Sequence, residues 1–320
     1  MIEYASNRVP LRLLAEQGGV LAVITAVEGT SYRNLGTMMA FGPDGQRVGS
    51  LSSGCIEDDI AEHAKTALAH GISTMLRYGA GSPFFDLKLP CGGGLQVLLV
   101  PQPNPAILRA VLAKGEARQD AVVVISLADG TLTLATPGAE SGPNHLTLTI
   151  APELRFWVYG HGIEALAFAL MAEAAGYDVT LFGQNNLQSD LSRLGALPMI
   201  SVPSFRSHIC PTPDRRTAVT LFFHDHEIEA RILSQFLGTD AFFIGAQGSL
   251  RARQRLLGEL KSLDLTAEMI SHLRPDFGLI PSCRDPRTLA VSVLAHVLAV
   301  ASEPVATVAN SQLRIPAKAG

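Results

Sequence analysis

Hydrophobic residues along this chain come in short runs separated by glycine, proline and polar residues, and the pattern is most regular between residues 153 and 183. An apolar run at 156–159 predicts a buried strand, and apolar residues at helical spacing over 163–175 predict a helix that ends near Gly176. A second apolar run at 179–182 predicts another strand. Strand, helix and strand in this order predict a βαβ unit with parallel strands.

The turn between this first strand and the helix reads G-H-G-I-E-A and begins at Gly160 and Gly162. Glycines in such a turn let the backbone approach a phosphate, and the free N–H groups at the helix start attract its charge. We therefore predict a Rossmann-type unit with a phosphate contact at these glycines. The second strand ends at Gly183 instead of the acidic residue that usually holds the ribose of NAD. The turn suits a phosphate, but the usual contact to a nicotinamide nucleotide is missing.

Polar residues follow the next buried strand, predicted at 217–223, where the sequence continues with His224 and Asp225. Ligands bind at the carboxyl ends of strands in open α/β sheets. We therefore predict that these two side chains act as a base or contact a ligand. Their consecutive positions direct the side chains apart, which argues against a shared metal ion.

A further strand predicted at 241–245 is followed by a second glycine-containing turn and a helix. Gly245, Gly248 and Ser249 form this turn, and Arg251 follows at once. A glycine turn at a helix start with arginine nearby is typical of an anion site. The arginines of this helix equally fit a solvated basic face.

The first half of the chain predicts a separate α/β lobe. Its predicted helices are 9–18, one that ends near residue 69, and 106–114; its predicted strands are 20–27, 38–41, 47–51, 74–78, 97–100, 121–127 and 146–150. Pro152 precedes the βαβ unit. We therefore predict an N-terminal domain over 1–151 and a doubly wound, parallel-sheet domain over 152–320.

Two cysteines of the first domain lie beside glycines. Cys55 follows Gly54 in a turn of small residues just before a predicted helix, whose N–H groups favour a thiolate, although the charge of Glu57 opposes it. A small residue buried in a tight turn is the alternative. Cys91 precedes Gly92 and Gly93, which leave its thiol open. A glycine-rich bend with an incidental cysteine is the alternative there.

Composition excludes several classes of protein. The 320 residues are 47% hydrophobic, which fits a globular α/β protein, and the net charge of −4 offers no basic field for nucleic acid. No apolar run reaches the ~18 residues of a spanning helix, and the first residues lack the layout of a signal peptide. We therefore expect no membrane association and a cytoplasmic location with reduced cysteines, and the absence of C-x-x-C argues against structural zinc.

Several of these segments together resemble the XdhC/CoxI family, accessory factors of xanthine dehydrogenase and related molybdenum hydroxylases. The resemblance covers almost the whole chain. It rests on E-G-T-S-Y-R at 28–33, V-G-S-L-S-S-G-C-I-E at 48–57, L-P-C-G-G at 89–93, G-H-G at 160–162, the segment 217–225, F-I-G-A-Q-G-S at 243–249 and the segment 286–295.

This resemblance implies a function. The protein would bind molybdenum cofactor, as molybdopterin or its cytosine dinucleotide, and protect it during exchange of an oxo for a sulfido ligand. It would then deliver the cofactor to the apo-subunit of a molybdenum hydroxylase, with a cysteine desulfurase as the source of sulfur. Cys55 and Cys91 would contact molybdenum or a persulfide, because soft thiolates suit both. The resemblance also implies that the protein forms a homodimer.

Departures from the family pattern leave two other functions open. Gly183 replaces a frequent Asp, and Ile280 and Ser282 stand in a stretch that often reads D-I-G-A, so acidic groups of the second domain are missing. The alternatives are an NAD(P)-dependent oxidoreductase and an interaction scaffold without a small ligand. If the resemblance holds, both cysteines and the turns at Gly160 and Gly245 face one cleft.

Overall fold

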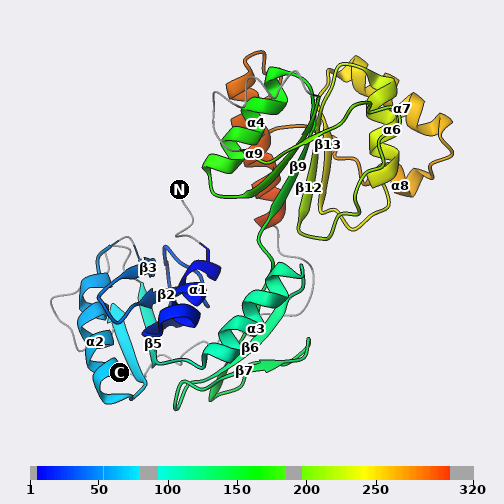
Figure 1. Cartoon of the computed structure of the whole chain (residues 1–320). Helices are drawn as coiled ribbons and strands as arrows, with labels where there is room; N and C mark the ends of the chain where they lie inside the picture. Colours follow the sequence, from blue (N-terminus) through cyan, green and yellow to red (C-terminus); the bar gives the residue numbers. More distant parts are fainter. Residues whose placement is uncertain (1–5, 53, 80–92, 185–196, 303–320) are drawn as a thin grey trace. The chain divides into compact units, whose positions relative to one another are not determined.

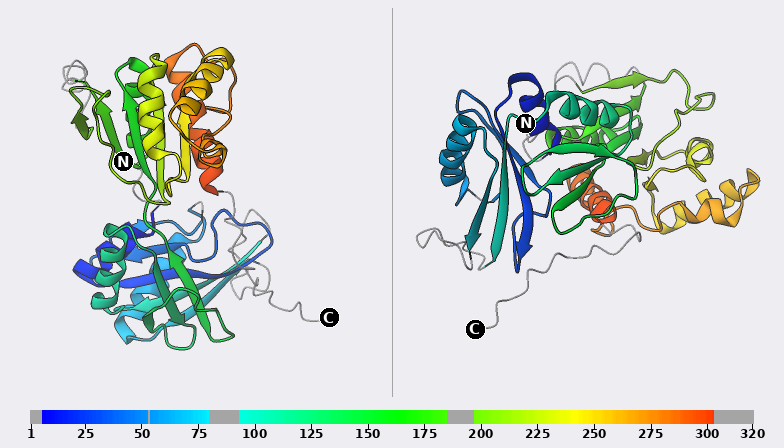
Figure 2. Two further views of the ribbon diagram at one scale, coloured as in Figure 1. Left: turned by 90° about the vertical axis from the view of Figure 1, so that its right-hand side faces the viewer. Right: turned by 90° about the horizontal axis from the view of Figure 1, so that it is seen from below.

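The computed structural model describes residues 6–52, 54–79, 93–184 and 197–302. The chain forms two compact units, and the division between them lies between Pro152 and Glu153. The sheets of the two units are separate (Figures 1 and 2). Each unit also has its own hydrophobic core.

The N-terminal unit is built on an antiparallel sheet with strand order β3-β2-β1-β5-β4. A smaller antiparallel sheet has the order β7-β6-β8. The elements are α1 (Arg8–Gln17), β1 (Val20–Glu28), β2 (Met38–Phe41), β3 (Arg47–Gly49), α2 (Glu57–His70), β4 (Thr74–Gly79), β5 (Gly94–Pro101), α3 (Pro105–Glu116), β6 (Ala121–Ser126), β7 (Leu132–Ala135) and β8 (His145–Ile150).

The central strand β1 is apolar on both faces because both faces are covered. Val20 and Ile24 pack in the cluster that contains the buried face of α2. Leu21 and Val23, which alternate with them, pack in a second cluster with side chains from α1, α3 and the smaller sheet. Successive side chains of a strand point to opposite faces, so an uninterrupted apolar run is what a sheet between two layers requires.

The C-terminal unit contains a parallel sheet with strand order β11-β10-β9-β12-β13. Helices α4 and α9 cover one face and α6 and α7 the other, so the predicted doubly wound fold is confirmed (Figure 1). The elements are β9 (Arg155–Gly160), α4 (Ile163–Ala174), β10 (Asp178–Gly183), β11 (Met199–Ser201), β12 (Thr217–Phe222), α6 (His226–Phe236), β13 (Phe243–Ala246), α7 (Leu250–Ser262), α8 (Ala267–Ser271) and α9 (Pro286–Ser302).

The strand order places the predicted site residues at one edge of this sheet. The order reverses between β9 and β12, and in open α/β sheets ligands bind at the carboxyl ends of the strands at such a switch point. Trp157 and Tyr159 of β9 face α6 and α7, whereas Phe156 and Val158 face α4 and α9. The sequence did not predict β11 or α8. Among the described helices, none combines the length and apolar character needed to cross a bilayer.

Candidate functional site

The loop between β3 and α2 places Cys55 just before the first turn of α2, as predicted. Its side chain is half-buried, so the thiol is partly accessible. Gly54 next to it has a positive φ of 94°, a conformation that glycine adopts without strain. A Cβ at Gly54 would meet no atom within 4 Å, so the backbone conformation alone selects glycine here.

A buried carboxylate organises this loop. Glu57 is 9% exposed and accepts hydrogen bonds from the backbone N–H groups of Leu51 (3.2 Å) and Ser52 (2.8 Å) and from the hydroxyls of Ser50 (3.2 Å) and Ser52 (2.5 Å). Burial raises the pKa of Glu57, but the hydrogen bonds, led by the Ser52 hydroxyl, outweigh burial and hold it below its ordinary value. The carboxylate is therefore charged and holds three loop residues around the start of α2.

Ser52 links this carboxylate to the cysteine. Its hydroxyl donates to Glu57 and accepts the backbone N–H groups of Gly54 and Cys55, each at 3.2 Å. The Cys55 sulfur lies 3.4 Å from the same hydroxyl oxygen. Because the serine hydrogen is directed to Glu57, the sulfur faces an oxygen whose hydrogen points away. The sequence predicted Glu57 only as a charge opposed to a thiolate, and its role in fixing the loop depends on contacts that the sequence does not show.

Two other segments of the N-terminal motifs meet this loop and each other. Gly93, just before β5, packs so closely on the end of β1 that a Cβ there would overlap the carbonyl oxygen of Thr30 and lie 2.8 Å from that of Glu28. Arg33 reaches from the same segment as Thr30 and donates to the carbonyl of Ser50 at 3.3 Å. The motifs at 28–33 and 48–57 and the last residue of 89–93 are therefore close in space. Cys91 and Gly92 lie outside the described residues.

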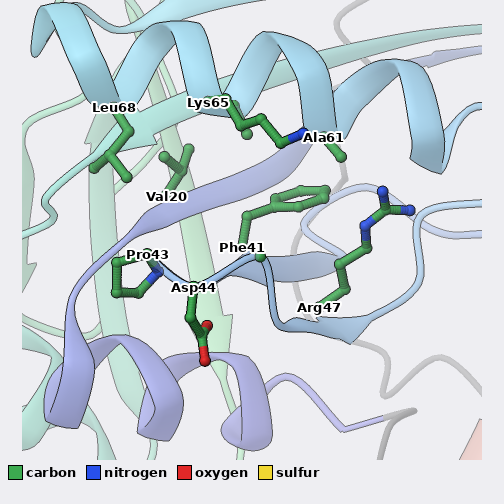
Figure 3. A pocket seen from close by; sticks show the side chains of 11 residues that line it. Val20, Phe41, Pro43, Asp44, Arg47, Ala61, Lys65 and Leu68 are labelled. Carbon is green, nitrogen blue, oxygen red and sulfur yellow. The ribbon is translucent and has the colours of Figure 1, made fainter.

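A pocket of about 420 Å³ opens on another side of the N-terminal unit, between α2 and the turn that joins β2 to β3 (Figure 3). Phe41 lies between the turn residues and α2, and Arg47 and Lys65 carry charge at the rim. Both cations have acidic partners, Asp58 and Glu62. None of the described residues predicted for the site lines this pocket.

In the C-terminal unit the turn after β9 leads directly into α4 and depends on its two glycines. A Cβ at Gly160 would lie 2.7 Å from the Cβ of Ala165 and 2.7 Å from the carbonyl oxygen of Phe222, so glycine allows α4 to pack on the sheet. Gly162 is the N-cap of α4 and provides no side-chain cap. Backbone N–H groups at this helix start are thus left for an anion, although Glu164 adds a negative charge to the first turn.

After β12, the two predicted side chains have different environments. His224 is exposed. Asp225 caps α6 and accepts the N–H groups of Glu227 at 3.0 Å and Ile228 at 3.3 Å. Arg206 lies 3.7 Å from Asp225 and also pairs with Glu227. Asp225 therefore has a structural role as a helix cap, and its contact with a ligand stays a prediction.

The turn after β13 begins beyond Gly245. Gly245 lies inside β13, in agreement with the predicted strand, and a Cβ there would come within 2.8 Å of the Phe277 ring, so this glycine serves packing and its contact with a ligand stays a prediction. Gly248 does precede the helix, and Ser249 caps α7 by accepting the N–H of Ala252 at 3.2 Å.

Three buried polar atoms that the sequence did not single out lie near this edge of the sheet. His161 Nδ1 follows β9, Glu229 Oε1 belongs to the helix after β12, and Gln247 Oε1 follows β13; these atoms have no hydrogen-bond partner among the described residues. The three strands are neighbours in the sheet. Buried polar groups are nearly always hydrogen-bonded, so three such atoms at adjacent strand ends point to a polar ligand.

Glu229 is unusual for a second reason. Burial raises its pKa to about 7, although the hydrogen bond from His226 lowers it. Nδ1 of His226 lies 2.9 Å from Oε2 of Glu229. Within the described part of the chain, no three His, Cys, Asp or Glu side chains are grouped as metal ligands would be. The Glu229 and Gln247 oxygens accept hydrogen bonds, so this edge suits a polar ligand with donor groups, and a glutamate with a pKa of about 7 can exchange a proton near neutrality.

Comparison with known proteins supports the resemblance found in the sequence. Residues 13–79 match the XdhC and CoxI family, and residues 156–297 match the XdhC Rossmann domain. The chain is 32% identical over 290 residues to the molybdenum cofactor insertion chaperone PaoD of Escherichia coli, with 90% of this chain and 85% of that protein covered. It is 24% identical to a protein of Bacillus subtilis described as a probable xanthine dehydrogenase subunit, with 88% and 93% covered.

A solved structure confirms the fold. The crystal structure of a xanthine dehydrogenase from Bacillus halodurans matches with a TM-score of 0.77 at 22% identity, covering 96% of this chain and 99% of that one. The two matched segments, one in each unit, and the identity to PaoD along nearly the whole chain lead to one conclusion. The chain belongs to the XdhC/CoxI family.

Proposed function

We propose that this protein binds molybdenum cofactor, supports exchange of an oxo for a sulfido ligand on it, and delivers it to a xanthine dehydrogenase-type hydroxylase. The observation that carries the proposal is the 32% identity to a molybdenum cofactor insertion chaperone over 90% of the chain. The role is binding and transfer, and turnover of a substrate is not required for it.

The described residues fit such a cofactor. Cys55 offers a partly accessible soft thiol on a loop fixed by Glu57. The uncapped start of α4 beyond Gly160 suits the phosphate, and the unpartnered atoms of His161 and Gln247 suit polar groups of the ligand. The bound cofactor supplies the molybdenum centre. Cys55 would supply a sulfur contact and the start of α4 a phosphate contact, and neither contact requires a ribose carboxylate.

The test is the pterin content of the purified full-length protein, measured as fluorescence after oxidation. We expect pterin in the wild type, and less in Cys55→Ser and in Cys91→Ser. Cys283→Ser is the matched control, because Cys283 is half-buried and its thiol donates to the Ile280 carbonyl at 3.2 Å. Unchanged pterin in both test variants refutes the thiol role, and absence of pterin from a host that makes it refutes cofactor binding.

The same preparation tests the alternatives and the remaining expectations. Tight NAD(P)H binding with hydride transfer favours an oxidoreductase, whereas capture of a hydroxylase subunit without pterin favours a scaffold. The cysteine desulfurase, the homodimer and the cytoplasmic location stay predictions, as does the arrangement of both units around one ligand. Co-purification with a desulfurase and the molar mass by light scattering test the first two.

A further inference from the structure

His226 and Glu229 form a hydrogen-bonded pair on the first turn of α6. Nδ1 of His226 and Oε2 of Glu229 are 2.9 Å apart. The glutamate side chain is 1% exposed and the histidine side chain 24%. A buried carboxylate that holds one ring nitrogen of a more accessible histidine fixes the ring orientation and its tautomer.

The protons carried by this pair decide what the other ring nitrogen of His226 can do. With one proton between them, Nδ1–H donates to Glu229 and Nε2 of His226 is an acceptor. A second proton makes Nε2 an N–H donor when it binds Nε2 itself, or when it binds Oε2 of Glu229 and the ring hydrogen moves to Nε2. Uptake of one proton therefore converts the accessible nitrogen from a group that repels anions into one that binds them.

The pair lies where a ligand is expected. It follows β12, whose carboxyl end flanks the switch point of the sheet. Oε1 of Glu229 is buried without a partner among the described residues, and so is Nδ1 of His161 after the neighbouring strand β9. The uncapped start of α4 follows the same turn as His161. The backbone N–H groups at the start of α4, which can bind an anion, and the His226–Glu229 pair, which can take up a proton, therefore follow neighbouring strands.

We propose that the His226–Glu229 pair is an anion contact of this site that takes up one proton when a phosphate-type group binds and gives it back when the group leaves. The proton comes from solvent and returns to it, and no bond between heavier atoms forms or breaks. This inference rests on the proposed function only in that the phosphate of the cofactor is such a group. It makes retention of the ligand stronger at lower pH and release easier at higher pH.

Other charged groups near the pair are accounted for. Asp225 raises the pKa of Glu229 through its charge, and the raised value of about 7 places the proton exchange near neutrality. Arg206, from the segment before β12, pairs with both Asp225 and Glu227 and reduces their influence. Along the same edge, the described chain also carries His161, Glu164 and His224, and the first turn of α7, which packs against α6, carries Arg251 and Arg253.

The experiment uses sulfate as the probe, because sulfate keeps its charge between pH 6 and 8 and any pH dependence then belongs to the protein. We expect the sulfate affinity of the full-length wild type to fall about tenfold from pH 6 to 8, the value for one linked proton with a pKa near 7. E229Q keeps the size of the side chain and should abolish most of this dependence. E227Q, on the same helix, is the matched control and should retain it.

Ring-nitrogen NMR of His226 makes the test independent of the variants. We expect Nδ1 to carry the proton at pH 8 without sulfate, and Nε2 to become protonated as sulfate is added. The inference is overturned if the sulfate affinity depends equally on pH in wild type and E229Q, or if the protonation of the His226 ring does not change when sulfate is added. Pterin content is measured separately, so a protein without pterin refutes the proposed function while leaving the sulfate result intact.

Discussion

Replacing Glu57 by glutamine tests whether one buried carboxylate holds the loop around Cys55. The carboxylate accepts hydrogen bonds from three backbone N–H groups and two hydroxyls, and glutamine keeps the shape but loses the charge and one acceptor oxygen. Hydrogen bonds to a charged group contribute about 1.5–3 kcal/mol each, but they are not additive and burial of the charge opposes them. We expect Glu57→Gln to lower the free energy of unfolding by about 2 kcal/mol at pH 7.

The pH dependence has a definite sign. Glu57 has a lowered pKa in the folded protein, so its contribution to stability is fully present above the unfolded value near 4.5 and is lost as pH falls through the folded value. The difference between wild type and Glu57→Gln should therefore be constant from pH 7 to 5.5 and shrink below pH 4.5. Glu62→Gln is the control: Glu62 is an exposed residue of the same helix, paired with Lys65, and should change stability by less than about 0.5 kcal/mol.

The assay separates the two units. Trp157 is the single tryptophan of the chain and lies in the core of the C-terminal unit, so its fluorescence follows that unit, whereas circular dichroism follows both. In urea, Glu57→Gln should shift the transition seen by circular dichroism more than the transition of Trp157. A loss of stability equal to that of Glu62→Gln, or one that does not shrink in acid, contradicts the proposed role of the carboxylate.

Three smaller predictions concern single contacts, each checked by urea unfolding. Gly93→Ala places a methyl group on the Thr30 carbonyl, so we expect a loss of about 3 kcal/mol or failure of the N-terminal unit to fold. The methyl group of Gly54→Ala meets open space, but the residue must keep a positive φ, so we expect the free energy of unfolding to fall by about 1–2 kcal/mol. Equal losses of stability in Gly93→Ala and Gly54→Ala contradict this reasoning. Asp225→Ala and Ser249→Ala each remove a helix cap, so each should lower the free energy of unfolding by about 1 kcal/mol. Asp225→Asn keeps the cap and should leave stability unchanged. The pterin content of Asp225→Asn then tests whether ligand binding needs the charge.

The amino-acid sequence by itself determined the fold class and most elements. The apolar runs at 20–27 and 156–159 predicted strands, and the structure shows that both faces of β1 and of β9 are covered. Glycine at Gly160 and Gly162 predicted a close turn before a helix, and α4 begins there. These features are local, because periodicity and backbone freedom depend on neighbouring residues.

Tertiary structure alone decided which side chains act together. Glu57 collects hydrogen bonds from a loop whose path is set by where β3 ends and α2 begins, and its charge alone does not predict that. Gly245 serves packing because Phe277, far along the chain, lies against it. The raised pKa of Glu229 results from burial. Its unpartnered oxygen lies near the same sheet edge as the unpartnered atoms of His161 and Gln247 only because β9, β12 and β13 are neighbours. Sequence patterns report local geometry, whereas burial and contacts between distant residues exist only in the folded chain.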